Sequence, residues 1–175
     1  MSNVNSLNAK RAFEILLGFV GYSLLISLLG LAFGPMAWAG SIVTTTLVGL
    51  VQLAALALAF GWSKELNVQG SLAATMACLT GVLLARLVGM TSLVGMLSIV
   101  QVIAFLVWMH GLYKALGRAD LMKIESALAL FLLVGIVLGG FLPGALKVGF
   151  SLAVILSLLG YFGHAFWQLR KEAAN

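Results

Sequence analysis

Six long apolar segments, separated by short polar or glycine-containing stretches, dominate the sequence. Each approaches the roughly 20 residues that a helix needs to cross about 30 Å of hydrocarbon. The pattern therefore predicts an all-α polytopic membrane bundle of six transmembrane helices. The expected spans, to within about 2–4 residues at each end, are 12–33, 38–62, 71–88, 93–113, 126–142 and 145–167.

Two kinds of connection alternate between these segments. The first, third and fifth connections contain Gly34-Pro35, residues 89–92 (GMTS) and Pro143-Gly144, which are turn signals almost without charge. The second and fourth connections, SKELNVQ and KALGRADLMKIE, are polar and charged. This alternation predicts that the six helices form three helical hairpins.

The predicted domain organisation is simple. Residues 1–11 form a polar and loosely ordered cytoplasmic tail, residues 12–170 a single transmembrane domain, and residues 171–175 a second cytoplasmic tail. The first span follows Lys10 and Arg11 but exceeds the usual length of a signal-peptide core, so we expect it to remain as an anchor.

Charge orients the predicted bundle. Lys and Arg in short loops are retained on the cytoplasmic face. With both termini inside, eight of the ten basic residues and all five acids are cytoplasmic, and only Arg86 and Lys147 fall towards the other face. The sequence thus predicts an integral protein of a bacterial inner membrane, with cytoplasmic N- and C-termini.

Composition supports a lipid-facing surface. The chain is 62% hydrophobic and 9% charged, against about 25% charged residues in a typical soluble domain. Its mean hydropathy is +1.14. The net charge of +5 comes from dispersed residues rather than a basic patch, which favours lipid headgroups over nucleic acid as the partner. A single cysteine, Cys78, excludes an intrachain disulfide and a cysteine-based metal cage.

A weak internal register accompanies the hairpins. Phe13-Glu14, Val68-Gln69 and Ile124-Glu125 each lie near the start of an odd-numbered span. A carboxylate there faces the positive end of the helix dipole. Threefold duplication of a hairpin explains the similarity, and so does a chemistry common to all cytoplasmic helix starts.

Small residues recur at four-residue spacing in three spans, where they allow backbones to approach closely. Internal packing of the bundle and docking of another subunit or a second copy both explain such faces. The residues concerned are Ala77, Gly81, Ala85, Gly135, Gly139, Gly149, Ala153 and Ser157.

Several polar side chains are expected at membrane depth. Arg86 lies about one turn from the outer end of its span, where it can snorkel to headgroups or contact an anionic substrate. Thr45, with its neighbours Thr44 and Thr46, and the amides Gln52 and Gln101 serve either hydrogen bonds between helices or a substrate pocket.

His110 and His164 are the only histidines, and both lie near the cytoplasmic ends of even-numbered spans. Two histidines at similar depth can ligate a b-type haem or a metal. Their aromatic surroundings also suit an interfacial aromatic belt, in which histidine is ordinary. For Glu14, the sequence predicts an ion pair with Lys10, four residues earlier.

The sequence contains no HExxH, GxSxG or phosphate-binding loop, which argues against an enzyme. We therefore expect a non-catalytic accessory or scaffolding subunit of a larger membrane complex. One alternative is the substrate-binding membrane component of a small-molecule transporter, and a lesser alternative is a haem-b electron-transfer subunit. In size and topology alone, the chain resembles the substrate-capturing components of energy-coupling-factor vitamin transporters. It lacks that family's Ala-x-x-x-Ala signature in the first span, where Gly18 and Gly21 are the nearest small pair.

Overall fold

A computed structural model describes the backbone of residues 3–33, 41–139 and 144–173. It describes the burial of side chains for residues 4–26, 29, 41–128, 130 and 153–173. The predicted breaks at Gly34-Pro35 and Pro143 lie outside the described residues.

The described part of the chain is all-α, with six helices as predicted. Each odd-numbered helix contacts the following even-numbered one, and α1 also contacts α6. Of the three predicted hairpins, only that of α3 and α4 has its turn within the described residues. The helices are α1 (Asn3–Phe33), α2 (Ile42–Glu65), α3 (Gln69–Leu87), α4 (Thr91–Ala115), α5 (Ala119–Gly139) and α6 (Gly144–Glu172).

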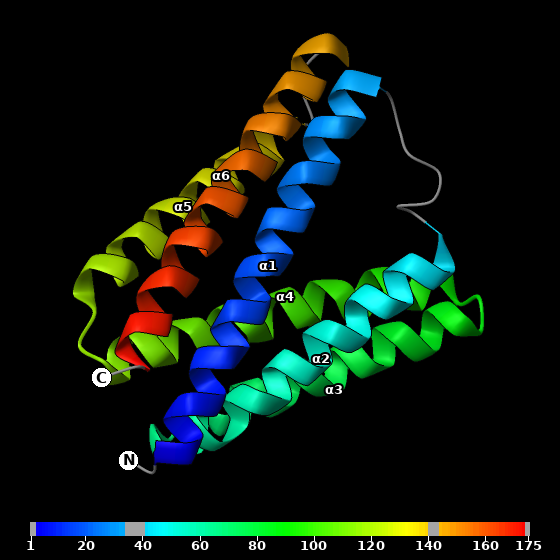
Figure 1. The fold of residues 1–175 in the computed structure, drawn as a ribbon. Coiled ribbons are helices and arrows are strands. Elements are labelled where there is room, and N and C mark those ends of the chain that lie inside the picture. Colours follow the sequence, from blue (N-terminus) through cyan, green and yellow to red (C-terminus); the bar gives the residue numbers. More distant parts are fainter. Residues whose placement is uncertain (1–2, 34–40, 140–143, 174–175) are drawn as a thin grey trace.

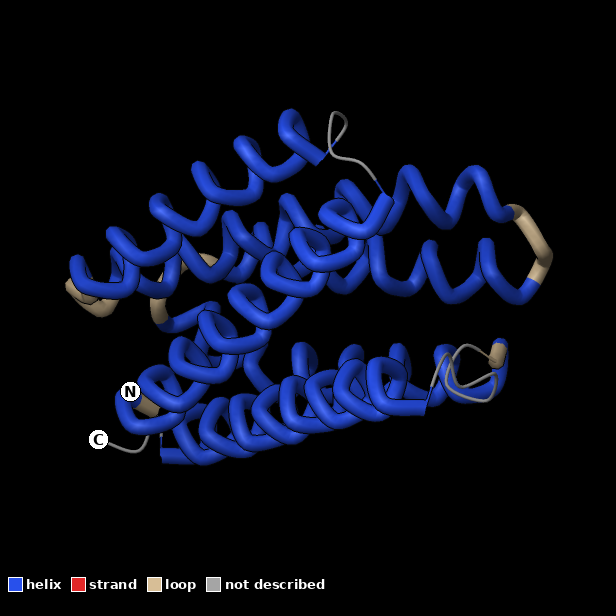
Figure 2. The backbone as a smooth tube through the Cα atoms, turned by 90° about the horizontal axis from the view of Figure 1, so that it is seen from above, coloured by secondary structure: helices blue, strands red, loops and turns tan. Residues whose placement is uncertain are grey.

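The helices form two groups of three. Figure 1 shows that α1, α5 and α6 run together in one direction and that α2, α3 and α4 run together in another. The groups meet at the end of the molecule where both chain termini lie, and they diverge away from it. The view from above also places the two termini side by side (Figure 2). We call the end where the groups meet the apex.

Three of the connections are tight turns of one kind. After α2, the amide of Val68 donates to Ser63 O at 2.8 Å, and after α4 the amide of Arg118 donates to Tyr113 O at 2.8 Å. A matching bond follows α3. This is the Schellman pattern, which requires a left-handed residue just beyond the helix. Asn67 (φ 57°) and Gly117 (φ 68°) supply that conformation at the two apical turns.

These turns shorten the loops that the charge pattern predicted. The charged residues of KALGRADLMKIE mostly lie within helices, since α4 continues to Ala115 and α5 begins at Ala119.

The N-terminal tail is a second correction. α1 begins at Asn3, so residues 3–11 are helical rather than loosely ordered, and the reason is that Ala9 is fully buried against the other helices.

Within the described residues, three helices are long and apolar enough to cross a membrane: α2, α3 and α4. The number of helices, six, agrees with the prediction. For membrane spans, the structure supports three candidates rather than the six expected.

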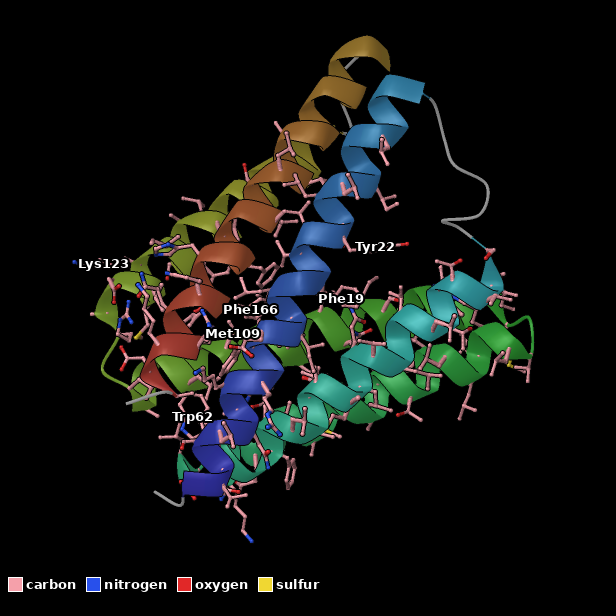
Figure 3. The ribbon with its side chains drawn as sticks, in the orientation of Figure 1. Phe19, Tyr22, Trp62, Met109, Lys123 and Phe166 are labelled. Carbon is pink, nitrogen blue, oxygen red and sulfur yellow. The ribbon has the colours of Figure 1, made fainter. Side chains whose placement is uncertain are left out.

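The buried core lies at the apex. Trp62, Trp108, Tyr113 and Phe13 are the largest fully buried side chains, and they come from the first turns of α1 and the last turns of α2 and α4. Figure 3 shows Trp62, Met109 and Phe166 together in this region. The structure thus gathers helix starts and helix ends at one place, in the arrangement that alternating hairpins require.

The sequence similarity between the starts of the odd-numbered helices is not matched by similar burial. Phe13 is fully buried, whereas Ile124, its predicted equivalent in α5, is 43% exposed. The two positions therefore have different environments, and the similarity of the sequences does not extend to packing.

Candidate functional site: an apolar cavity between the two helix groups

A set of polar contacts joins neighbouring helices at the apex. Arg170 Nε donates to Glu14 Oε1 at 2.8 Å and so links α6 to α1. Glu14 therefore pairs across helices, and not with Lys10 as the spacing along α1 predicted. Asn5 Nδ2 donates to Glu65 Oε1 at 2.7 Å and links α1 to α2. These contacts connect helix ends that are far apart in the sequence.

Arg118 holds the turn after α4 against the end of α6. Its guanidinium donates to Glu172 at 2.9 Å and to both carboxylate oxygens of Asp120. The hydrogen bonds from Arg118 lower the pKa of Asp120 from its usual 3.8 to about 2. A lowered pKa means that this pair stabilises the fold above about pH 4 and loses its effect as the pH falls towards 2.

An aromatic cluster lies directly beneath these contacts. The ring of Phe13 packs edge-on against Trp62 at 5.6 Å and lies nearly parallel to Trp108 at 6.4 Å and Phe166 at 6.3 Å. Trp108 Nε1 donates to the buried Ser63 hydroxyl at 3.0 Å. The cluster joins α1, α2, α4 and α6, so it determines how the two helix groups meet.

Beyond the aromatic cluster, where the groups begin to diverge, lies a cavity of about 330 Å³. Its walls come from α1, α2, α3, α4 and α6, and most of the lining side chains are leucine, valine or phenylalanine. Pockets of this size and largely apolar lining, with a few polar groups, are typical of small-molecule sites. The polar residues that line it are Ser23, Gln52, Thr75 and Gln101.

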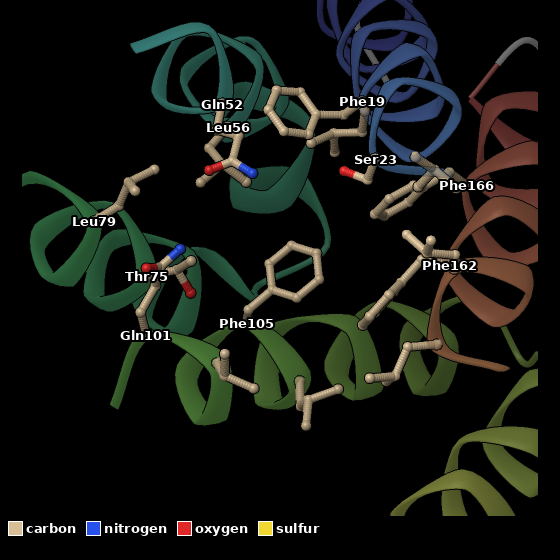
Figure 4. A pocket seen from close by; sticks show the side chains of 16 residues that line it. Phe19, Ser23, Gln52, Leu56, Thr75, Leu79, Gln101, Phe105, Phe162 and Phe166 are labelled. Atoms are coloured by element: carbon tan, nitrogen blue, oxygen red, sulfur yellow. The ribbon is translucent and has the colours of Figure 1, made fainter. Parts of the chain in front are cut away.

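Two of the predicted site residues, Gln52 and Gln101, thus meet at one cavity. Figure 4 shows both amides on the side formed by α2, α3 and α4, with Thr75 beside Gln101. Neither amide has a hydrogen-bond partner in the described part of the chain. Both side chains are half-buried, so their amide groups can hydrogen-bond an occupant of the cavity.

The other two predicted substrate contacts lie elsewhere. The Thr45 hydroxyl donates to the carbonyl of Ser41 at 2.9 Å, within the first turn of α2. Arg86 lies half-buried in the last turn of α3, away from the cavity. Both residues therefore serve a helix terminus and do not contact this site.

The two histidines have different surroundings in the part of the chain that the structure describes. His110 Nδ1 lies 2.8 Å from Glu125 Oε2, and this pair joins α4 to α5. His164 is exposed and lines an open groove between α5 and α6 with Ser157 and Tyr161. No group of three metal-ligating side chains occurs among residues that the structure describes. Haem ligation by His110 and His164 stays an untested prediction.

The small-residue faces divide into two sets. In α3, a side chain at Gly81 would meet Leu97 of α4 at 3.1 Å, and Ala85 is buried, so these positions pack within the bundle. Ala77 of α3, and Ala153 and Ser157 of α6, are exposed. The surroundings of Gly135, Gly139 and Gly149 lie outside the described residues.

The phenylalanines of the cavity were not identified from the sequence. Phe19, Phe105 and Phe162 lie on three different helices, and each has a spacing that also suits ordinary packing. One signal for Phe105 was available in the sequence. Gln101 lies four residues earlier, one helical turn away, so the two side chains share a face of the helix.

Comparisons with protein-family models, with curated proteins and with solved structures find no match to this chain. The functional argument therefore depends on the geometry of the cavity and on the physical chemistry of its lining.

Proposed function

We propose that all six helices cross a bilayer, with the apex on the cytoplasmic side of a bacterial inner membrane. The proposal is supported by the lengths of α1 and α6, which have 31 and 29 residues, and by the gathering of all five acids at the apex. Large exposed apolar side chains such as Val43, Leu47 and Ile103 cover the rest of α2 and α4, where lipid would contact them.

Cysteine labelling tests this topology. In a chain with Cys78 replaced by alanine, a cysteine at Met90 or at Gly140 is expected to react with a membrane-impermeant maleimide on intact cells. A cysteine at Lys64 or Lys123 should react only after permeabilisation, because Lys and Arg mark the inner face. Protection of Gly140→Cys in intact cells, with Met90→Cys labelled, would leave α5 and α6 outside the set of spanning helices.

For function, we infer a non-catalytic membrane component that binds a small molecule in the cavity between the two helix groups, as a transport system requires. The observation that carries this inference is the convergence of Gln52 and Gln101, from α2 and α4, on one cavity lined otherwise mainly by apolar side chains. Amides and hydroxyls orient a ligand by hydrogen bonds, and the apolar walls supply contact area.

Filling the cavity tests the binding function. Val102 lines the cavity yet is largely exposed, so Val102→Trp is expected to fill the site without repacking the core. Val107 lies on the same helix, is similarly exposed and does not line the cavity, so Val107→Trp is the matched control. Native mass spectrometry from nanodiscs should detect a bound small molecule on the wild type and on the control, and at least about tenfold less on Val102→Trp.

Equal occupancy of both variants, or no bound mass on the wild type, would contradict a binding role. Copurification of other chains at a defined stoichiometry would instead support the scaffolding function. The exposure of Ala153 and Ser157 on α6 favours that second candidate, since such a face lets another helix approach closely.

A further inference from the structure

The class of ligand can be inferred from how the cavity is lined, and this step depends on the proposed function. Most of the polar capacity comes from Gln52 and Gln101, because the Thr75 hydroxyl already donates to Ser71 O at 2.8 Å and Ser23 adds one hydroxyl from α1. A primary amide both donates and accepts hydrogen bonds. Two primary amides on one wall therefore suit a ligand whose polar end can both donate and accept hydrogen bonds.

Phenylalanines contribute to the rest of the lining, beside leucine and valine side chains. Phe105 lies 5.7 Å from Phe162 and 6.2 Å from Phe166, and Phe162 and Phe166 lie 5.8 Å apart. Figure 4 shows Phe162 and Phe166 on the α6 side, across the cavity from Gln52 and Gln101. Aromatic side chains contact flat rings by offset stacking and edge-to-face packing. A planar ring system fits this end of the cavity.

Charge limits the choice further. The residues that line the cavity include no Asp, Glu, Lys, Arg or His in the part of the chain that the structure describes. A charged group transferred from water to such walls would lose its hydration without gaining a counter-ion. The lining therefore discriminates against anions and cations.

We propose that the cavity binds a neutral, flat, largely apolar molecule, with its one polar end on Gln52 and Gln101 and its ring against Phe105, Phe162 and Phe166. A molecule of this kind partitions into the bilayer, so lipid itself delivers it to the protein.

Three probes with the same ring test the proposal. Naphthalene-2-carboxamide has a polar end that donates and accepts, naphthalene has none, and 2-naphthoate is charged at neutral pH. Equilibrium dialysis against phosphatidylcholine nanodiscs containing the full chain, corrected with empty nanodiscs, measures each Kd. We expect the carboxamide to bind at least about tenfold more tightly than either of the other probes. Naphthalene makes no hydrogen bond to the amides, and naphthoate can accept from them but loses the hydration of its charge without gaining a counter-ion.

Substitutions then locate the interaction. The double variant Gln52→Leu, Gln101→Leu is expected to reduce carboxamide affinity to that of naphthalene. Gln168→Leu, an amide on α6 outside the cavity, should leave it unchanged. Tighter binding of naphthoate, equal binding of all three probes, or loss of affinity in the Gln168 control would overturn the proposal.

The inferred class of ligand and the proposed binding function can fail separately. A copurified molecule that is charged or polyhydroxylated, and is lost in Val102→Trp, would refute the inferred class and leave the binding function standing. Absence of any molecule, together with no probe binding, would refute both.

Discussion

Replacing Phe13 with alanine is expected to lower the free energy of unfolding by about 3 kcal/mol. Soluble proteins lose about 3–5 kcal/mol when a buried phenylalanine is truncated. The lower end applies in the proposed bilayer, where a lipid-exposed ring is less unfavourable than one in water, while the cavity left behind keeps its cost. Phe13 is fully buried and contacts Trp62, Trp108 and Phe166, so four helices lose contacts at once.

Reversible unfolding in mixed micelles with increasing SDS measures this loss. Phe60→Ala is the control, because Phe60 lies on α2 but is 38% exposed and outside the cluster. A similar loss in both variants would mean that the aromatic cluster contributes no more than surface packing does.

The hydrogen bond between Tyr113 and Tyr161 gives the second large effect. The two hydroxyls lie 2.8 Å apart, Tyr113 on α4 and Tyr161 on α6, and both side chains are buried. Tyr161→Phe is expected to cost about 1–3 kcal/mol because it leaves the Tyr113 hydroxyl desolvated and without a partner.

A double-mutant cycle separates that penalty from the loss of the bond. Replacing both tyrosines with phenylalanine removes both polar groups, so the double variant should be less destabilised than the sum of the two single variants. The expected coupling is about 1–2 kcal/mol, measured by the same SDS titration. Strict additivity would show that the two hydroxyls do not depend on each other.

Much of the fold could be predicted from the hydrophobic pattern. Apolar runs of about 20 residues, separated by turn signals such as Gly89, predict the six helices, because in the proposed bilayer a segment of this length can satisfy its own backbone groups only as a helix. The charge pattern correctly grouped the ends of the helices at one place. It did not predict that α1 begins at Asn3, because a polar N-terminal stretch gives no sign of the surface that will bury Ala9.

The candidate site was predictable only in part. An amide in an apolar run is unusual, and that signal identified Gln52 and Gln101. The same reasoning proposed Thr45 and Arg86, which the structure places at helix ends, since a polar residue in a span can equally serve its own helix. Which helix faces which depends on packing angles, and a single sequence does not contain them. The cavity and its phenylalanines therefore required the three-dimensional arrangement.

The concentration of contacts at the apex has a mechanical consequence. α4 has 25 residues and is therefore about 37 Å long. It packs beside α3, and its fully buried residues lie near its C-terminal end, where the two helix groups meet. A tilt of about 10° at that end moves the opposite end by about 6 Å. The far ends of the helices thus move much further than the residues at the apex do. A change in the packing around Phe13 that tilted one helix group against the other would therefore alter the separation of α1 from α4, on either side of the cavity.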